Sequence, residues 1–324
     1  MKYLLFLLLI TFRLEAQDIA DKQIYLADPA IFYAGGTYYL YGTVEGNSNN
    51  GFKVYSSTDQ KNWIDKGFAL KRGESFGGKG FWAPQVFAYD RRFYMAYVAD
   101  ERIAIAQSDS PLGPFVQKEK KELEAPVKQI DPFVFVDDDG KTYLYHVRLQ
   151  NGNRLFVAEL KKDLSGIIPE TLTECISATE SWENTAKTDW PVAEGPSVLK
   201  RKGLYYLFYT ANDFRNPDYA VGFATSESPL GPWKKYGKNP ILSRKNIAAN
   251  GTGHGDFFLD KKGNLNYVFH THNSVTAVGK RKTALIKVNF KTEPGKADLP
   301  LPDFKSFYFV ESKKASTLFN IHRI

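Results

Sequence analysis

Three carboxylic residues that lie far apart in the chain stand in similar short motifs. Asp28 occurs in ADPAIF, Asp131 in IDPFVF and Glu194 in EGPSV. When carboxyl groups face one another in a protein, their pKa values move apart, and one stays protonated while another is ionised. A protonated acid and an ionised base are what the hydrolysis of a glycosidic bond requires. The three acids predict this chemistry if the fold brings them together.

Each of the three acids also has an ordinary structural explanation when it is taken alone. Asp-Pro is a common opening of a turn, which covers Asp28 and Asp131. Glu194 before Gly195-Pro196 is equally ordinary. The functional interpretation is favoured because all three acids occupy the equivalent place in an internal repeat.

The chain contains one structural unit five times, recognisable by its pattern more than by identity. Every unit begins with a hairpin, in which a short apolar strand and an aromatic strand flank a charged or glycine-containing turn. Turns such as Gly35-Gly36 and Lys202-Gly203 suit the positive φ that tight hairpins need. The hairpins span residues 27–42, 83–98, 130–147, 194–211 and 254–271.

A third strand, a turn and a fourth strand follow each hairpin. The segment YAVGFATSESPLGPW shows this second half of the unit. Five such units predict an all-β fold, a five-bladed β-propeller with four antiparallel strands per blade. Residues 19–26 and 304–310 also look like strands and are expected to complete the last blade.

The first strand of each propeller blade lines the central channel, so the residues at the starts of these strands gather at one mouth. In the five units these residues are Asp28, Trp82, Asp131, Glu194 and His254. The sequence thus predicts a cavity where three carboxyls meet an indole and an imidazole. The other histidines are expected to be structural; they are His146, His270, His272 and His322.

Aromatic residues are abundant, with 24 Phe, 19 Tyr and 5 Trp, and this favours strands over a helical bundle. Many stand in the second strands of the hairpins, where they are expected to pack blade against blade. Others occur near the unit starts or in the loops between units, where an aromatic ring is suited to stack on a sugar face. These candidates are Phe81, Trp82, Trp182, Trp190 and Phe214.

Taken in order, ADPAIF, WAPQV, IDPFVF, EGPSV and GTGHGDFF resemble the pattern of glycoside hydrolase family 43 over nearly the whole chain. The resemblance implies an inverting mechanism in which Asp28 is the general base and Glu194 the general acid. It assigns to Asp131 the role of modulating the pKa of the acid and orienting it. It requires no cofactor.

The same resemblance extends to residues that contact the sugar or a metal. Trp82 matches an aromatic near the sugar site, and His254 matches a channel histidine beside a water-coordinated calcium ion. A structural calcium ion in the central channel is therefore expected. The family also holds the sugar with an arginine from the last blade, for which Arg281 is the candidate, with Lys280 or Lys282 as alternatives.

The expected function is that of an exo-glycosidase that releases α-L-arabinofuranosyl or β-D-xylosyl residues from plant polysaccharide. Hydrolases of arabinan backbones or β-galactan remain alternatives within the family, and a catalytically silent carbohydrate-binding propeller is the alternative outside enzymes. Propeller hydrolases of sucrose and fructan are disfavoured. They open with Asn-Asp-Pro-Asn-Gly, whereas this chain has Ala-Asp-Pro-Ala-Ile at residues 27–31.

The first residues resemble a secretory leader. An apolar run at residues 3–12 follows Lys2, and Ala16 offers a cleavage site, so residues 1–16 are expected to be a signal peptide and 17–324 one catalytic domain. The run is shorter than the roughly 20 residues of a membrane span. The protein is expected to be periplasmic or secreted.

Composition limits the partners. The net charge is +7, but no basic stretch is combined with features that read nucleic acid, so none is expected as a partner. Cys175 is the only cysteine, which excludes an intrachain disulfide. A monomer that binds a polysaccharide or oligosaccharide and does not span a membrane is expected.

Overall fold

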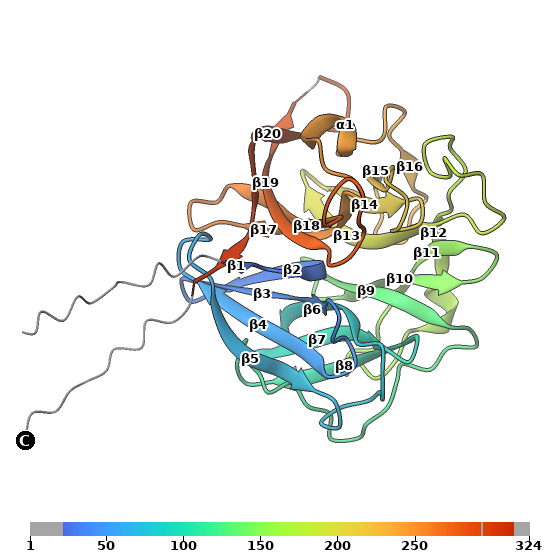
Figure 1. Ribbon diagram of the computed structural model, residues 1–324. Helices are drawn as coiled ribbons and strands as arrows, with labels where there is room; N and C mark the ends of the chain where they lie inside the picture. Colours follow the sequence, from blue (N-terminus) through green and yellow to red (C-terminus); the bar gives the residue numbers. More distant parts are fainter. Residues whose placement is uncertain (1–21, 293, 314–324) are drawn as a thin grey trace, which may run out of the picture.

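The computed structural model describes residues 22–292 and 294–313, which form small antiparallel sheets arranged as a five-bladed β-propeller (Figure 1). Blade 1 consists of β2 (Leu26–Ala34), β3 (Thr37–Val44), β4 (Gly51–Ser57) and β5 (Ile64–Lys71). Blade 2 consists of β6 (Trp82–Tyr89), β7 (Arg92–Ala99) and β8 (Arg102–Ser108). Blade 3 consists of β9 (Gln129–Val136), β10 (Thr142–Leu149), β11 (Asn153–Glu159) and β12 (Thr173–Ile176).

Blade 4 consists of β13 (Ala193–Arg201), β14 (Leu204–Ala211), β15 (Ala220–Ser226) and β16 (Lys234–Lys235). Blade 5 consists of β17 (Gly253–Leu259), β18 (Leu265–Thr271), β19 (Lys282–Lys291) and β20 (Leu299–Phe309). Helical structure in the described residues is limited to a 3-10 turn, η1 (Pro169–Thr171), and α1 (Arg244–Ile247). The described part of the chain contains no helix with the length and hydrophobicity of a membrane span.

The predicted propeller is confirmed, with a reduced fourth strand in blade 2. There Val116 forms an isolated antiparallel bridge to Gln107, with N···O distances of 3.0 and 2.9 Å. The residues before it include Pro111 and Pro114, which have no N–H to donate to a strand ladder. The fourth strand of this blade therefore shrinks to one pair.

The ends of the described chain meet at blade 5 (Figure 1). As expected, the segment near residues 304–310 completes this blade, because β20 pairs with β19. The N-terminal side forms its own pair, β1 (Lys22–Gln23) with β21 (Glu311–Ser312). Ile24 then bridges the ends, since its N–H donates to Val310 O and its carbonyl accepts from Thr283 N–H. Residues 19–21 of the expected strand lie outside the described residues.

Buried side chains form a core at each boundary between neighbouring blades. Phe52 of blade 1 packs against Tyr97 of blade 2, and Phe208 of blade 4 against Phe257 of blade 5. Tyr38 closes the circle against Phe258, with ring centroids 5.9 Å apart. Hairpin aromatics thus pack blade against blade, as the sequence predicted.

A β-bulge interrupts the pairing of every inner strand near its start. In blade 1 the register jumps from Ala27 to Ala30, and the other four blades show the same irregularity. Four of the bulges contain a proline, which cannot donate to the ladder. The fifth contains Gly255, where an added Cβ would lie 1.9 Å from Val268 O. The residues at these bulges form the candidate site.

Candidate active site

The five bulges surround the mouth of the channel and open into a cavity of about 450 Å³. All three predicted carboxyls line this cavity, so the expectation that the fold gathers them is confirmed. These carboxyls belong to Asp28, Asp131 and Glu194. The other predicted residues on the wall of the cavity are Trp82, Trp190, Phe214, His254 and Arg281, and Asn153 of β11 is one that the sequence analysis did not name.

The bulge determines the direction of each side chain. Asp28, Asp131 and His254 adopt positive φ angles of 49°, 54° and 43° at their bulges. In blade 4 this place is taken by Gly195, with φ 58°, and Glu194 precedes it. Trp82 likewise precedes the bulge of its blade. The five unit starts are therefore not strictly equivalent, and the acid in blade 4 enters the cavity one residue earlier than the other two.

Asp28 is held as an ion by positive and donating neighbours. Thr43 Oγ1 donates to its Oδ2 at 2.7 Å, and Arg281 Nη1 and His254 Nδ1 each lie 3.3 Å from its Oδ1. Its backbone N–H donates to His270 Nδ1 at 3.1 Å. Burial by itself raises the pKa of Asp28, but the charges of His254 and Arg281 outweigh it and hold the pKa below its ordinary value.

The pKa of Glu194 is shifted in the opposite direction. Burial and the negative charge of Asp131 raise the pKa of Glu194 to about 7. Two hydrogen bonds fix its carboxyl: Tyr219 OH donates to Oε1 at 2.8 Å, and Asn153 Nδ2 donates to Oε2 at 2.8 Å. A carboxyl with this pKa retains its proton in part at neutral pH, as a general acid requires.

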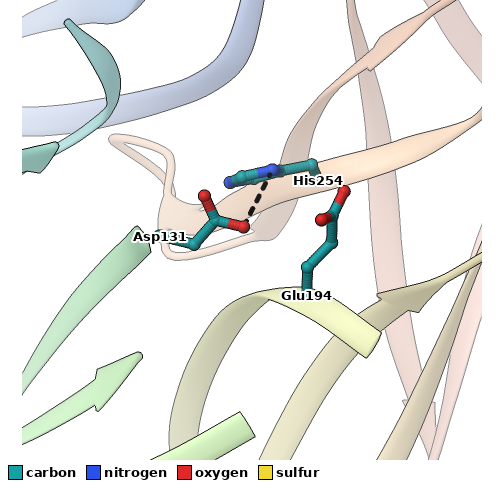
Figure 2. Close-up of side chains that lie close together, drawn as sticks. All are labelled: Asp131, Glu194 and His254. Atoms are coloured by element: carbon teal, nitrogen blue, oxygen red, sulfur yellow. Dashed lines mark ion pairs between the residues drawn. The ribbon is translucent and has the colours of Figure 1, made fainter. Parts of the chain in front are cut away.

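Asp131 lies between the other two acids. Its Oδ2 accepts the N–H of Gly195 at 3.1 Å and lies 3.7 Å from His254 Nδ1 (Figure 2). Burial and the negative charge of Asp28 raise the pKa of Asp131 to about 8. Ionisation of Asp131 therefore disfavours ionisation of the neighbouring Glu194.

Asp131, Glu194 and His254 form a compact group, in which one ligand atom from each lies within 4.8 Å of the others (Figure 2). Calcium takes six to eight oxygen ligands, and imidazole is not among its preferred ligands. Two carboxyls supply only part of such a shell. A calcium ion at this group would therefore take most of its ligands from water.

The predicted sugar-binding residues divide into two groups. Trp82, Trp190, Phe214 and Arg281 line the cavity, and the guanidinium of Arg281 lies 4.7 Å from the centre of the Phe214 ring. Trp182 does not line it, and neither does Phe81. Its ring is fully buried, stacked on Tyr97 at 6.1 Å, so the expectation that Phe81 contacts sugar is corrected.

Several residues that support the acids had no signal in the sequence. Thr43 and Tyr219 donate to Asp28 and Glu194, and Glu45 Oε1 accepts from Arg281 Nε at 2.5 Å. They lie outside the starts of the inner strands on which the sequence analysis relied. His270, expected to be structural, contacts the backbone of Asp28 and is fully buried.

Comparisons with known proteins agree with this geometry. The family model described as "Glycosyl hydrolases family 43" matches residues 22–294. The chain is 30% identical over 276 residues to "Xylosidase/arabinosidase 43A" of Humicola insolens, covering 68% of this chain and 82% of that protein. It is 27% identical over 311 residues to "Xylosidase/arabinosidase" of Bacteroides ovatus, covering 82% of this chain and 90% of that one.

A solved structure has the same fold. The crystal structure of an "Endo-1,4-beta-xylanase" from Bacteroides thetaiotaomicron VPI-5482 superimposes with a TM-score of 0.82 and 39% identity. The match covers 92% of this chain and 99% of that protein.

Proposed function

The chain belongs to glycosyl hydrolases family 43 and is a glycoside hydrolase, and from this premise we propose that it releases terminal α-L-arabinofuranosyl or β-D-xylosyl residues from plant polysaccharide with inversion. The observation that carries the proposal is that Asp28 and Glu194 line one cavity in opposite electrostatic surroundings, which shift their pKa values in opposite directions. The names of the Humicola and Bacteroides ovatus relatives support the two sugars.

In the proposed mechanism, the ionised Asp28 accepts a proton from water as the water oxygen attacks the anomeric carbon. Glu194 donates its proton to the glycosidic oxygen while the bond between that oxygen and the anomeric carbon breaks. Asp131 positions the acid through the backbone of Gly195 and disfavours its ionisation. Arg281, Trp82 and Phe214 are assigned to the sugar that is released.

The test compares aryl α-L-arabinofuranoside and β-D-xyloside with intact arabinan, arabinoxylan and galactan. Asp28→Asn and Glu194→Gln are expected to lower kcat/KM on a cleaved polysaccharide at least about 100-fold, because each removes a proton transfer. Asp109→Asn and Glu119→Gln change exposed carboxyls and serve as matched controls. Wild-type turnover in the two site variants would refute the assignment.

The same panel decides between the alternatives. Release of single sugars supports exo action. Release of oligosaccharides from xylan would instead show internal cleavage, an alternative that the name of the B. thetaiotaomicron protein supports. Release from arabinan or galactan backbones would favour the other family activities. Binding of these polysaccharides without any turnover would identify a silent carbohydrate-binding propeller.

No cofactor is proposed, since the hydrolysis consumes only water. A calcium ion is proposed in the channel beside His254, held largely by water. The proposal of export rests on the leader at residues 1–16, which lies outside the described residues. The proposal of a monomer rests on the sequence. N-terminal sequencing of exported protein and sedimentation test these two expectations.

A further inference from the structure

Trp190 is a large aromatic side chain left open at the edge of the catalytic cavity. It lies in the loop between β12 and β13, is 48% exposed and lines the cavity. An exposed aromatic that is held in place beside a site is typical of a surface that binds a ligand. The contacts of Trp190 show how it is held.

A chain of two hydrogen bonds joins this indole to the acid. Trp190 Nε1 donates to Asn153 Oδ1 at 2.9 Å, and Asn153 Nδ2 donates to Glu194 Oε2 at 2.8 Å. An indole N–H only donates, so the oxygen of the Asn153 amide must face Trp190 and its nitrogen must face Glu194. The amide orientation is thus determined by chemistry.

The backbone holds the same loop in place. Asn153 N–H donates to Pro191 O at 3.0 Å, and Asn153 pairs with Val192 in an isolated bridge. Gly152 permits this close approach, because an added Cβ there would lie 2.5 Å from Pro191 O. The loop that carries Trp190 is therefore attached to the start of β11 directly after Trp190.

The cavity has a base side and an acid side. Asp28 and Arg281 come from blades 1 and 5, whereas Glu194 and Asn153 come from blades 4 and 3. In the proposed reaction, water attacks from the side of the base, and the leaving group departs past the acid that protonates it. Trp190 stands beyond that acid, where the leaving group must lie.

We infer that Trp190 and Asn153 form a subsite for the leaving group, which takes a sugar residue of an oligosaccharide chain; this rests on the proposed function. The Trp190 ring stacks on the face of that sugar. Asn153 is a positioning residue, which holds Oε2 of Glu194 toward the glycosidic oxygen. Occupation of the subsite by sugar keeps the indole and the amide aligned with the acid.

The test uses two pairs of probes, 4-nitrophenyl β-D-xyloside with xylotriose and 4-nitrophenyl α-L-arabinofuranoside with arabinotriose. The pair that wild type cleaves is used. Trp190→Ala is expected to raise KM for the trisaccharide about 10-fold and to change KM for the aryl glycoside much less. Trp190→Phe retains a stacking ring and is expected to restore most of the trisaccharide KM.

Asn153→Ala tests the positioning role separately. It is expected to lower kcat for the trisaccharide about 10-fold with little change in KM, because a poor leaving group depends on a well-placed acid. Across aryl glycosides of 2,4-dinitrophenol, 4-nitrophenol and phenol, the loss is expected to grow as the leaving group becomes more basic. A purely structural role of Asn153 would lower all three rates alike.

Phe304→Ala is the matched control, because Phe304 is an exposed aromatic on β20 with 40% of its surface accessible. It is expected to leave the ratio of the KM values for the trisaccharide and the aryl glycoside unchanged. If wild type cleaves none of the probes, the proposed function fails and the subsite with it. If wild type cleaves a pair but Trp190→Ala raises KM equally for both probes of that pair, the subsite is refuted and the function stands.

Discussion

At the scale of single residues, the pKa values of the carboxyls in the site differ because each carboxyl has different charged groups beside it. Asp28 faces the cationic Arg281 and the imidazole of His254, whereas Glu194 faces the carboxyl of Asp131. All three acids are similarly buried. The sign of the nearby charge therefore decides which acid keeps its proton.

The opposite shifts predict the pH dependence of kcat/KM. The proposed mechanism requires protonated Glu194 and ionised Asp28, so kcat/KM is expected to fall as pH rises through about 7, where Glu194 loses its proton. On the acid side, Asp28 stays ionised below the ordinary aspartate range, so activity is expected to persist into mildly acidic solution. The measurement is kcat/KM on an aryl glycoside between pH 4 and pH 9.

Glu119→Gln removes an exposed carboxyl and should reproduce the wild-type profile. A wild-type basic limb near the ordinary pKa of glutamate would contradict the assignment of Glu194 as the acid.

At the scale of elements, the β-bulge at the start of each inner strand determines the direction of the side chains that line the cavity. It places non-glycine residues at positive φ in four blades, a conformation that costs energy and is often found at functional sites. In blade 4 the place belongs to Gly195, where an added Cβ would lie 2.8 Å from His254 Cγ. The glycine thus makes room for the histidine that contacts two of the acids.

Gly195→Ala and Gly203→Ala separate this packing from backbone strain. Both glycines have positive φ, at 58° and 81°, but an added Cβ on Gly203 meets nothing within 4 Å. Gly203→Ala is expected to lower the free energy of unfolding by about 1 kcal/mol and to retain activity. Gly195→Ala is expected to cost about 1–3 kcal/mol more and to lower kcat/KM at least about 10-fold, since His254 must move.

Urea unfolding and kinetics on the same preparations check both values. Equal losses of stability and activity in the two variants would show that His254 does not depend on the space at Gly195.

At the scale of the whole molecule, five hydrophobic boundaries and one terminal closure hold the blades in a ring. Ile24 is 2% exposed and packs in the core shared by blades 1 and 5, where Trp63 and Val310 are fully or almost fully buried. The inner strands all contribute residues to the mouth of the channel. A cation in the channel would therefore contact parts of several blades at once.

The proposed calcium ion predicts a response of the whole fold to chelation. Removing the ion with EDTA is expected to lower Tm by roughly 2 °C or more, and adding calcium back should restore it, because an ion that binds only the folded state stabilises it. His254→Ala is expected to abolish this sensitivity. Thermal unfolding of the exported protein, with and without EDTA, measures it, and an unchanged wild-type Tm and activity would refute the ion.

Much of the architecture is already readable in the sequence. Hairpins of alternating apolar and aromatic residues recur five times, and a pattern that repeats predicts repeated local structure because strand pairing within a hairpin is local. The same repeat predicted that Asp28, Asp131 and Glu194 meet, and they line one cavity. Their catalytic roles remain predictions.

Tertiary structure alone decided what surrounds the acids. Thr43, Tyr219 and Asn153 reach the acids from second or third strands and from a loop, 15, 25 and 41 residues away in the chain. The burial of Phe81 beside the half-buried Trp82 likewise follows from how blades 1 and 2 pack.

The physical reason is that pKa values and ligand contacts depend on distances between side chains of different blades. Local sequence determines which residues begin an inner strand. The bulges and the packing of the ring determine which of their atoms face one another, and thereby which carboxyl holds the proton.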